Sequence, residues 1–226
     1  GKSTLARVIT GLLPPFQGDV RFCGEVLSPA LANRGREQLQ SIQMIYQMPD
    51  VALNPRQKIA EIIGRPLEFY LGMKGAEKVA TINRLLEQIE LPADYAERYP
   101  AQLSGGEKQR ICIARALAAE PDLIICDEVT SALAQLVAEG ILELLQNLQN
   151  QLGVSYLFIT HDLATVKAIA DSIVVMYQGR VVEQGPKAEI LSPPHEAYTE
   201  LLLSSVPDIN PQSQKPLEPP PKPQKI

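Results

Sequence analysis

Gln47, Asp127, Glu128 and His161 are polar residues that stand at the ends of three short apolar segments. Such segments are typical of buried strands, and an open α/β sheet binds its ligands beyond the carboxyl ends of its strands. We therefore expect these side chains to converge on one crevice. Two neighbouring carboxylates there can hold the shell of a Mg²⁺ ion and activate water for phosphoryl transfer. Singly, a turn residue, a helix cap or solvated charges would explain them, but together they favour this chemistry.

The chain opens on Gly1-Lys2-Ser3-Thr4, which matches the end of the phosphate-binding loop GxxxxGK[ST]. Such a loop needs a small residue where backbone amides approach phosphate, an ammonium for the β- and γ-phosphate oxygens and a hydroxyl for Mg²⁺. The helix N-terminus that follows favours an anion. A polar chain terminus would explain the tetrapeptide alone, so its support is the set of strand-end residues. Because the chain does not begin with Met, we expect a fragment whose first segment is missing.

The segment 103–110, which reads Leu-Ser-Gly-Gly-Glu-Lys-Gln-Arg, is the most specific pattern in the chain. Ser104 can act as the N-cap of a helix, and Glu107, three residues later, can complete a capping box. Gly105 and Gly106 leave the backbone amides uncovered, so the same helix start can receive a phosphate. A well-capped helix alone does not explain two consecutive glycines in its first turn, where they cost stability.

The elements that must position these residues alternate between strands and helices. Buried strands that alternate with helices predict an α/β fold whose sheet is mainly parallel and covered on both faces. From about residue 58 to residue 102 the apolar spacing is helical throughout, which predicts an all-helical insertion in that core. The predicted strands cover 44–46, 123–126, 154–159 and 173–176, and the predicted helices between them cover 136–148 and 163–170.

Composition excludes several other classes of protein. The 226 residues carry 21 Lys and Arg against 26 Asp and Glu, a net charge of −5 that offers no global attraction to nucleic acid. No apolar stretch approaches the roughly 20 residues that span a bilayer. The three cysteines are odd in number and far apart, which suits free thiols in a reducing compartment. Residues 207–226 are rich in proline and predict an extended, disordered tail.

In this order the motifs resemble those of the ATP-binding subunits of ABC transporters, over about residues 1–206. That resemblance implies a P-loop NTPase core with an inserted helical subdomain. The matching motifs are the end of Walker A (1–4), the Q-loop (Gln47), the signature (103–110), Walker B (123–128) and the H-loop (His161). Residues 46–50, 53–56 and 193–199 are further similar to the oligopeptide and dipeptide importers, a branch that also serves glutathione and nickel.

The resemblance implies a role for each matching residue. Gly1 and Lys2 would bind the β- and γ-phosphates of ATP, Thr4 would lie near the α- and β-phosphates, and Ser3 would bind Mg²⁺. Asp127 would hold that Mg²⁺ through water. The other roles concern hydrolysis: Gln47 would sense the metal and the attacking water, Glu128 would be the general base, His161 would contact the γ-phosphate, and Ser104, Gly105 and Gly106 would cap the γ-phosphate of a partner subunit.

The resemblance also implies an organisation and partners. A second ATPase subunit, identical or homologous, would pair head to tail with this one at the cytoplasmic face of the inner membrane. Transmembrane permease subunits would bind the pair, an extracytoplasmic solute-binding protein would act indirectly, and nucleic acid would not be a partner. We expect an ATP-binding core at 1–57 and 115–192, a helical signature subdomain at 58–114, a peptide-importer extension at 193–206 and the tail at 207–226.

The sequence departs from the family pattern at three points. The first P-loop glycines and the residue that stacks on adenine would lie before Gly1. Ser131-Ala132-Leu133 is followed by Ala134 where the resembled family has the D-loop Asp, a residue that lies at the dimer seam of that family and helps to couple its two ATP sites. No Cys follows Cys126, so we expect no iron–sulfur cluster of the kind that some members carry. Ala134 and the missing start favour one rival interpretation, a degenerate half that dimerises with an active partner. A second rival, a soluble ABC ATPase that acts on DNA or ribosomes, would need zinc-ligand cysteine pairs, long coiled-coil insertions or a basic arm, and the sequence shows none of these.

Overall fold

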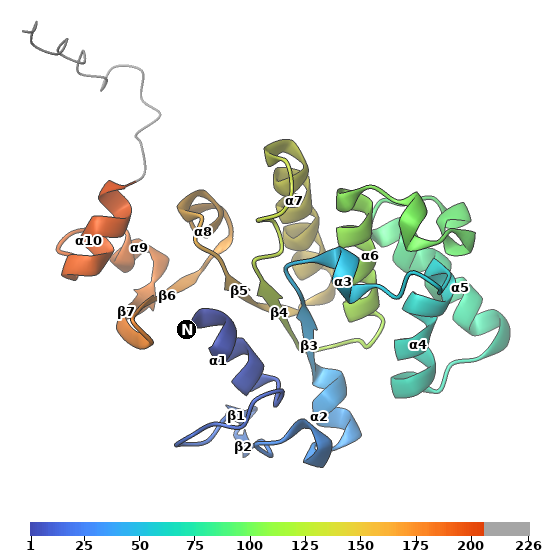
Figure 1. Ribbon diagram of the computed structural model, residues 1–226, viewed down its shortest axis with the longest axis horizontal. Helices are drawn as coiled ribbons and strands as arrows, with labels where there is room; N and C mark the ends of the chain where they lie inside the picture. The colour runs from blue at the N-terminus through green and yellow to red at the C-terminus, as the bar shows by residue number, and fades with distance from the viewer. Residues whose placement is uncertain (206–226) are drawn as a thin grey trace, which may run out of the picture.

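The computed structural model describes residues 1–205 (Figure 1). The strands are β1 (Arg21–Phe22), β2 (Glu25–Val26), β3 (Ile42–Ile45), β4 (Leu123–Asp127), β5 (Ser155–Ile159), β6 (Ser172–Tyr177) and β7 (Arg180–Pro186). The helices are α1 (Lys2–Ile9), α2 (Arg36–Ser41), α3 (Pro49–Ala52), α4 (Ile59–Leu71), α5 (Gly75–Gln88), α6 (Gly105–Leu117), α7 (Gln135–Leu152), α8 (Leu163–Ile169), α9 (Lys187–Ile190) and α10 (Ala197–Ser204). Short 3-10 turns cover Leu31–Asn33, Ala93–Glu97 and Pro100–Gln102.

The central sheet is parallel and has the order β3-β4-β5, as the buried apolar runs predict. β4 lies in the middle, and its residues Ile124, Ile125 and Cys126 are completely buried. A strand flanked by parallel neighbours and covered by helices on both faces needs such a continuous apolar run. The register pairs Cys126 with Ile45 on one side and with Phe158 on the other, so the three strands end together.

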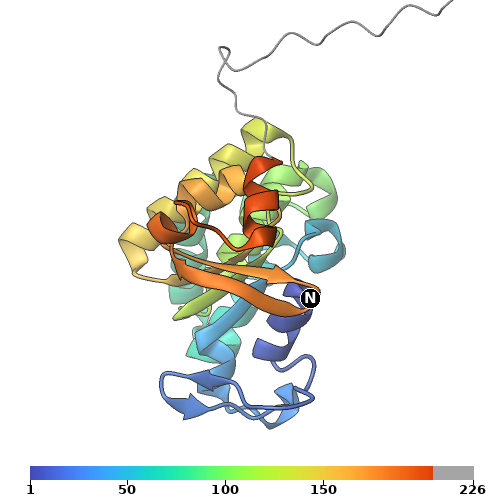
Figure 2. The same ribbon diagram turned by 90° about the vertical axis from the view of Figure 1, so that its left-hand side faces the viewer.

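The strand expected at 173–176 is present as β6, but it does not belong to the parallel sheet. β6 pairs antiparallel with β7 in a separate two-stranded sheet. The turn between them consists of Gln178 and Gly179, both at positive φ (47° and 80°), and two such residues close a hairpin whose twist matches its strands. Figure 2 shows this hairpin between the β1–β2 hairpin and α10.

β5 and β6 face each other across a cavity of about 520 Å³ instead of pairing. Its lining comes from both strands, from α8 and from the first turn of α1, including Lys2 and Leu5. In keeping with this, β5 is buried along only part of its length, and Val174 of β6 is 53% exposed. The three-stranded sheet therefore has β3 as one edge strand and β5 as the other, and the cavity lies beside β5.

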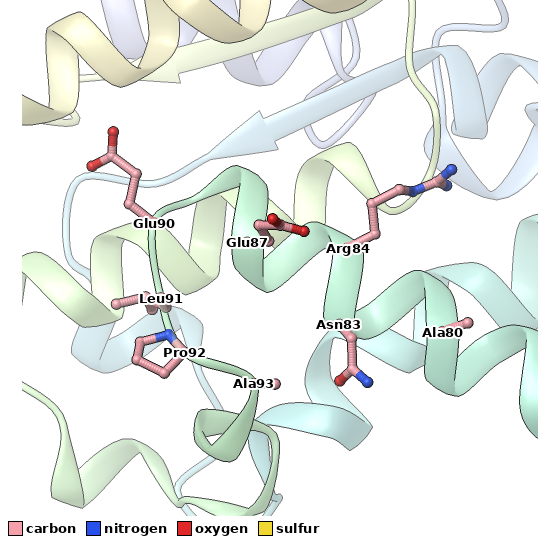
Figure 3. Close-up of a pocket in the computed structure, with 8 residues that line it drawn as sticks. All are labelled: Ala80, Asn83, Arg84, Glu87, Glu90, Leu91, Pro92 and Ala93. Carbon is pink, nitrogen blue, oxygen red and sulfur yellow. The ribbon is translucent and has the colours of Figure 1, made fainter.

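The helical region, formed by α4, α5 and α6, stands beyond β3 on the side away from β6 and β7 (Figure 1). α4 and α5 bury one apolar stripe each, whereas α6 is buried around most of its circumference; Ile63 of α4, Leu86 of α5 and Ile111 of α6 are completely inaccessible. A hollow of about 660 Å³ lies on its surface, along α5 and the segment that follows it (Figure 3). Arg84, Glu87 and Glu90 contribute charges of both signs to that hollow, and none of the predicted site residues line it.

At the C-terminal end, α10 packs back on the β6–β7 hairpin. The rings of Tyr198 and Tyr177 lie 4.2 Å apart, between their centroids. The tail predicted at 207–226 lies outside the described residues. No helix within residues 1–205 is both long and apolar enough to cross a membrane.

Candidate active site

Ser3 and Asp127 come together at the carboxyl end of β4. Ser3 lies in the first turn of α1, and Asp127 is the last residue of β4, where its side chain is largely buried. The Ser3 hydroxyl donates a hydrogen bond to Asp127 Oδ1 at 2.9 Å, although 124 residues separate the two. Mg²⁺ prefers oxygen ligands and usually keeps several of its waters. A hydroxyl oxygen and a carboxylate oxygen that lie this close together can both bind it. The pair therefore fits a magnesium ion.

The other residues of the opening tetrapeptide surround the start of α1. Gly1 is its N-cap, and a Cβ atom built on Gly1 would lie 3.3 Å from the Cα of Gly179, so a larger residue would crowd the β6–β7 turn. Lys2 borders the cavity beside β5. Thr4 is exposed in the first turn. A cation and a helix N-terminus at one place attract a phosphate group.

Glu128 is the centre of a second group, which we call the strand-end cluster: Gln47, Glu128, Ser131 and His161. Gln47 Nε2 donates to Glu128 Oε2 at 2.8 Å. His161 Nδ1 lies 3.2 Å from Glu128 Oε1. Both carboxylate oxygens are therefore occupied by side chains from other strand ends. The sequence prediction that Gln47, Glu128 and His161 converge agrees with this geometry.

The backbone of Glu128 is unusual because its φ is +52°, in the left-handed region that non-glycine residues seldom adopt. Its N–H donates to the carbonyl oxygen of Ile159 at 2.9 Å, which continues the β4–β5 ladder by one residue. Non-glycine residues at positive φ cluster at functional sites, where the surrounding structure holds them. The turn lifts the carboxylate out of the sheet, and its side chain is 23% exposed.

Ser131, the first residue of the D-loop segment, is the member of the cluster to which the sequence motifs assigned no role. Its hydroxyl accepts from Gln47 Nε2 at 3.1 Å and donates to the carbonyl oxygen of Glu128 at 3.0 Å. The signal in the sequence is a serine three residues after a carboxylate, a spacing that side-chain-to-backbone turn motifs use. That signal is common in loops, so it carries no function by itself.

His161 is positioned by the helix start that follows it. Asp162 is the N-cap of α8 and accepts hydrogen bonds from the backbone N–H groups of Ala164 and Thr165. The hydroxyl of Thr165 also donates to this carboxylate, and these bonds hold the pKa of Asp162 below its usual range. A capped helix start fixes the direction in which the chain leaves β5. His161 itself remains 69% exposed, so it can also contact a ligand.

Gln47 is positioned by α3, the short helix that begins two residues after it. Lys108 of α6 makes an ion pair with Asp50 at 2.6 Å, and Arg115 of α6 donates to the carbonyl oxygen of Ala52 at 2.6 Å. These two contacts fasten α3 to α6 at both ends. α3 therefore links the strand-end cluster, through Gln47, to the signature helix α6.

Ser104, Gly105 and Gly106 do not join the strand-end cluster; they form the start of α6. Ser104 is the N-cap, and it exchanges hydrogen bonds with Glu107 in the capping box that the sequence predicts. The hydroxyl of Tyr95 donates to Glu107 and lowers the pKa of this carboxyl most, and the backbone N–H of Ser104 donates to it as well. A Cβ atom on Gly106 would lie 2.6 Å from Val137 Cγ1, so close packing against α7 requires glycine there.

The sequence comparisons identify the family. The family described as ABC transporter matches residues 1–131, which is more than half of the chain. The chain belongs to the ABC transporter family. The family described as the C-terminal region of oligopeptide/dipeptide transporters matches residues 182–226.

Relatives of this ABC chain are named for peptide transport. The dipeptide transport ATP-binding protein of Escherichia coli is 38% identical over 98% of this chain and 70% of its own length. The oligopeptide transport ATP-binding protein of Haemophilus influenzae is 41% identical over 95% of this chain and 65% of its own length. A 41% identical relative from Brucella abortus is matched over 92% of this chain, which spans 62% of that relative.

Solved structures confirm the fold of an ABC ATP-binding domain. A dimeric ATP-binding cassette in a post-hydrolysis state, bound to ADP and phosphate, superposes with a TM-score of 0.70 at 30% identity; the match covers 82% of this chain and 80% of that one. CbiO1 of Clostridium perfringens, part of an ABC transporter complex, superposes with a TM-score of 0.71 at 28% identity over 84% of this chain and 74% of that one. The α/β core with its added helices is therefore the fold that the sequence predicts.

Proposed function

We propose that this chain is the ATP-hydrolysing subunit of an ABC importer for peptides or related small solutes. The observation that carries the proposal is the position of Glu128: it lies one residue after the Ser3–Asp127 pair, with Gln47 and His161 on its two carboxylate oxygens. The names of the relatives and the match to the oligopeptide/dipeptide C-terminal region support the kind of solute.

In this proposal the opening tetrapeptide and β4 bind the nucleotide. Gly1, Lys2 and the amides of the first turn of α1 receive the β- and γ-phosphates, and Thr4 lies near the α- and β-phosphates. Ser3 and Asp127 would hold Mg²⁺, and Gln47 would sense the metal and the attacking water. Bound Mg²⁺ supplies neutralisation of charge that develops on the phosphate oxygens.

Glu128 then acts as the general base. Its carboxylate is oriented by Gln47 and is partly accessible to water, so it can accept a proton from a water molecule aimed at the γ-phosphate. His161 holds the second carboxylate oxygen and is exposed enough to reach the γ-phosphate itself. A positioned general base typically contributes roughly 10²–10⁴ to the rate.

The signature residues act on a second subunit. Ser104, Gly105 and Gly106 start α6 away from the strand-end cluster, so we propose that they cap a γ-phosphate bound to another ATPase subunit, identical or homologous. Permease subunits would anchor the pair at the cytoplasmic face of the inner membrane. α3 is bound to α6 through Lys108 and Arg115. A movement of Gln47 on nucleotide binding would therefore shift α3 and, with it, the signature residues at the start of α6.

A second candidate function is a degenerate half that binds ATP and dimerises without turning it over. The observation that favours it is Ala134, which is the N-cap of α7 and makes no side-chain cap. An Asp at this position would both cap the helix and present a carboxylate at the expected dimer seam. The intact strand-end cluster favours the catalytic reading over this one.

The test is ATP-dependent uptake of labelled di- and oligopeptides by the full-length protein, reconstituted with its permease subunits and solute-binding protein in lipid vesicles. We expect uptake that requires Mg-ATP and disappears in Glu128→Gln. Glu143→Gln, the same change at an exposed position of α7, is the matched control and should transport normally. Full uptake by Glu128→Gln would remove the catalytic role, and ATP turnover without uptake of any peptide would point to another solute.

A further inference from the structure

Ser131 links two residues of the strand-end cluster that otherwise meet only through their side chains. Its hydroxyl accepts from Gln47 Nε2 at 3.1 Å and donates to the backbone carbonyl oxygen of Glu128 at 3.0 Å. The backbone N–H of Ser131 donates to the same carbonyl oxygen at 3.1 Å. One hydroxyl therefore connects the end of β3 to the turn that follows β4.

The bonds from Ser131 support the conformation of Glu128. Its left-handed backbone (φ +52°) persists only where the surroundings determine it. The N–H of Glu128 is held by Ile159, and its carbonyl oxygen is held twice by Ser131. Glu128 is thus fixed on both sides of its Cα. Because the backbone N–H of Ser131 holds this carbonyl oxygen by itself, removal of the hydroxyl leaves the Glu128 backbone anchored and removes only the bond to Gln47 and the second bond to the carbonyl oxygen.

Gln47 gains a defined orientation from the same hydroxyl. Its side chain is exposed, and a free glutamine side chain keeps considerable rotational freedom. The two hydrogens of its amide nitrogen are the donors to Glu128 Oε2 and Ser131 Oγ. Two acceptors at fixed positions define the plane of the amide group. With one acceptor alone, the amide group could rotate about that single hydrogen bond.

We propose that Ser131 is a positioning residue for ATP hydrolysis: it holds the amide of Gln47 against the carboxylate of Glu128. The inference rests on the proposed function, because it concerns residues that matter for turnover only if the chain hydrolyses ATP. It gives a specific role to Ser131, which opens the D-loop segment that ends at Ala134. The ordinary explanation is a serine that closes a turn and does nothing for Gln47.

The experiment is a double-mutant cycle on the full-length protein in its reconstituted transporter, with ATP turnover and ATP KM measured for each variant. The variants are Ser131→Ala, Gln47→Ala and both together. Ser131→Thr keeps a hydroxyl, and Thr130→Ala removes a hydroxyl from the neighbouring position as a control. Thermal melting of every variant separates loss of orientation from loss of folding.

We expect Ser131→Ala to lower kcat roughly three- to tenfold, the size of one lost hydrogen bond, with KM and melting temperature nearly unchanged. Ser131→Thr should restore most of the rate, and Thr130→Ala should match the unmodified protein. Because Ser131 acts through Gln47, the double variant should be no slower than Gln47→Ala alone.

Three results would overturn the inference. Wild-type turnover in Ser131→Ala would mean that the hydroxyl is not needed. Losses that multiply in the double variant would mean that Ser131 acts independently of Gln47. Failure of Ser131→Thr to restore the rate would mean that the loss in Ser131→Ala comes from the changed shape of the side chain and not from the lost hydroxyl. If Glu128→Gln turned over ATP normally in the same assay, the proposed function would fail instead, whatever the Ser131 variants did.

Discussion

The helical region and the strand-end cluster are built from opposite kinds of contact. In the helical region, apolar side chains spaced by one or two helical turns along α4, α5 and α6 meet in a dry core, and Ile63, Leu86 and Ile111 are fully buried. In the strand-end cluster, polar and partly exposed side chains meet across 81 residues between Gln47 and Glu128 and 33 residues between His161 and Glu128. The helical region therefore contributes stability, whereas the proposed function assigns the chemistry to the cluster.

The largest effect on stability should come from truncating the helical core. Leu86→Ala should lower the free energy of unfolding by about 2–5 kcal/mol, because it removes a buried side chain and leaves a cavity. Turnover per folded molecule should stay within about twofold, since Leu86 lies away from the cluster; denaturant unfolding and active-site titration measure the two quantities. Val79→Ala, at a 55% exposed position of the same helix, is the control. An equal loss of stability in the control would contradict this account.

The helical region and the strand-end cluster also differ in how far the sequence could predict them. The spacing of Ile82, Leu85 and Leu86 predicts the α5 helix because helical periodicity is local. The convergence of Gln47, Glu128 and His161 could be predicted only through the rule that parallel strands end at one edge. Ser131 was given no role because it lies in the loop beyond the end of β4, where the rule about strand ends does not place a side chain.

The β6–β7 hairpin shows where local pattern is insufficient. Residues 173–176 have the apolar run of a buried parallel strand, yet β6 pairs with β7. Nothing in that run distinguishes the two pairings; the turn at Gln178 and Gly179 does. A polar residue followed by glycine between two strand patterns is a hairpin signal, and it stood just beyond the predicted strand.

At Ala134 we expect a substitution that raises the free energy of unfolding, by less than Leu86→Ala lowers it. From the sequence, alanine here should leave the fold undisturbed, but its position as N-cap of α7 is one where alanine is a poor residue. Ala134→Asp should therefore raise the stability by about 1 kcal/mol, a shift of roughly 2–4 °C in melting temperature for a chain of this size. Ala134→Asn should give the same shift without the charge.

Comparison of ATP turnover in these two variants isolates the role of the carboxylate. We expect turnover to rise in the Asp variant alone, because only Asp places a negative charge at the expected seam. Equal turnover in the Asp and Asn variants would show that the missing carboxylate is silent. An unchanged melting temperature in both would show that the α7 N-terminus is satisfied by other means.

The smallest effect concerns acid stability of the signature helix. The pKa of Glu107 is lowered chiefly by the hydrogen bond from Tyr95, so its contribution to stability is complete above its ordinary value of 4.5 and is lost as the pH falls through the lowered pKa. Glu107→Gln should therefore flatten the dependence of stability on pH below about 4.5, as measured by denaturant unfolding at several pH values. An unchanged slope would show that the carboxylate does not titrate with folding.

The most direct test of the account is single-turnover hydrolysis of labelled ATP by the Glu128→Gln variant of the full-length protein in its assembled transporter, with nucleotide binding and thermal melting measured on the same sample. The account predicts bound ATP, an unchanged melting temperature and a release of phosphate slowed by roughly 10²–10⁴, because shape is kept and the base is lost. Phosphate release at the unmodified rate would contradict it, and would remove Glu128 from the centre of the site.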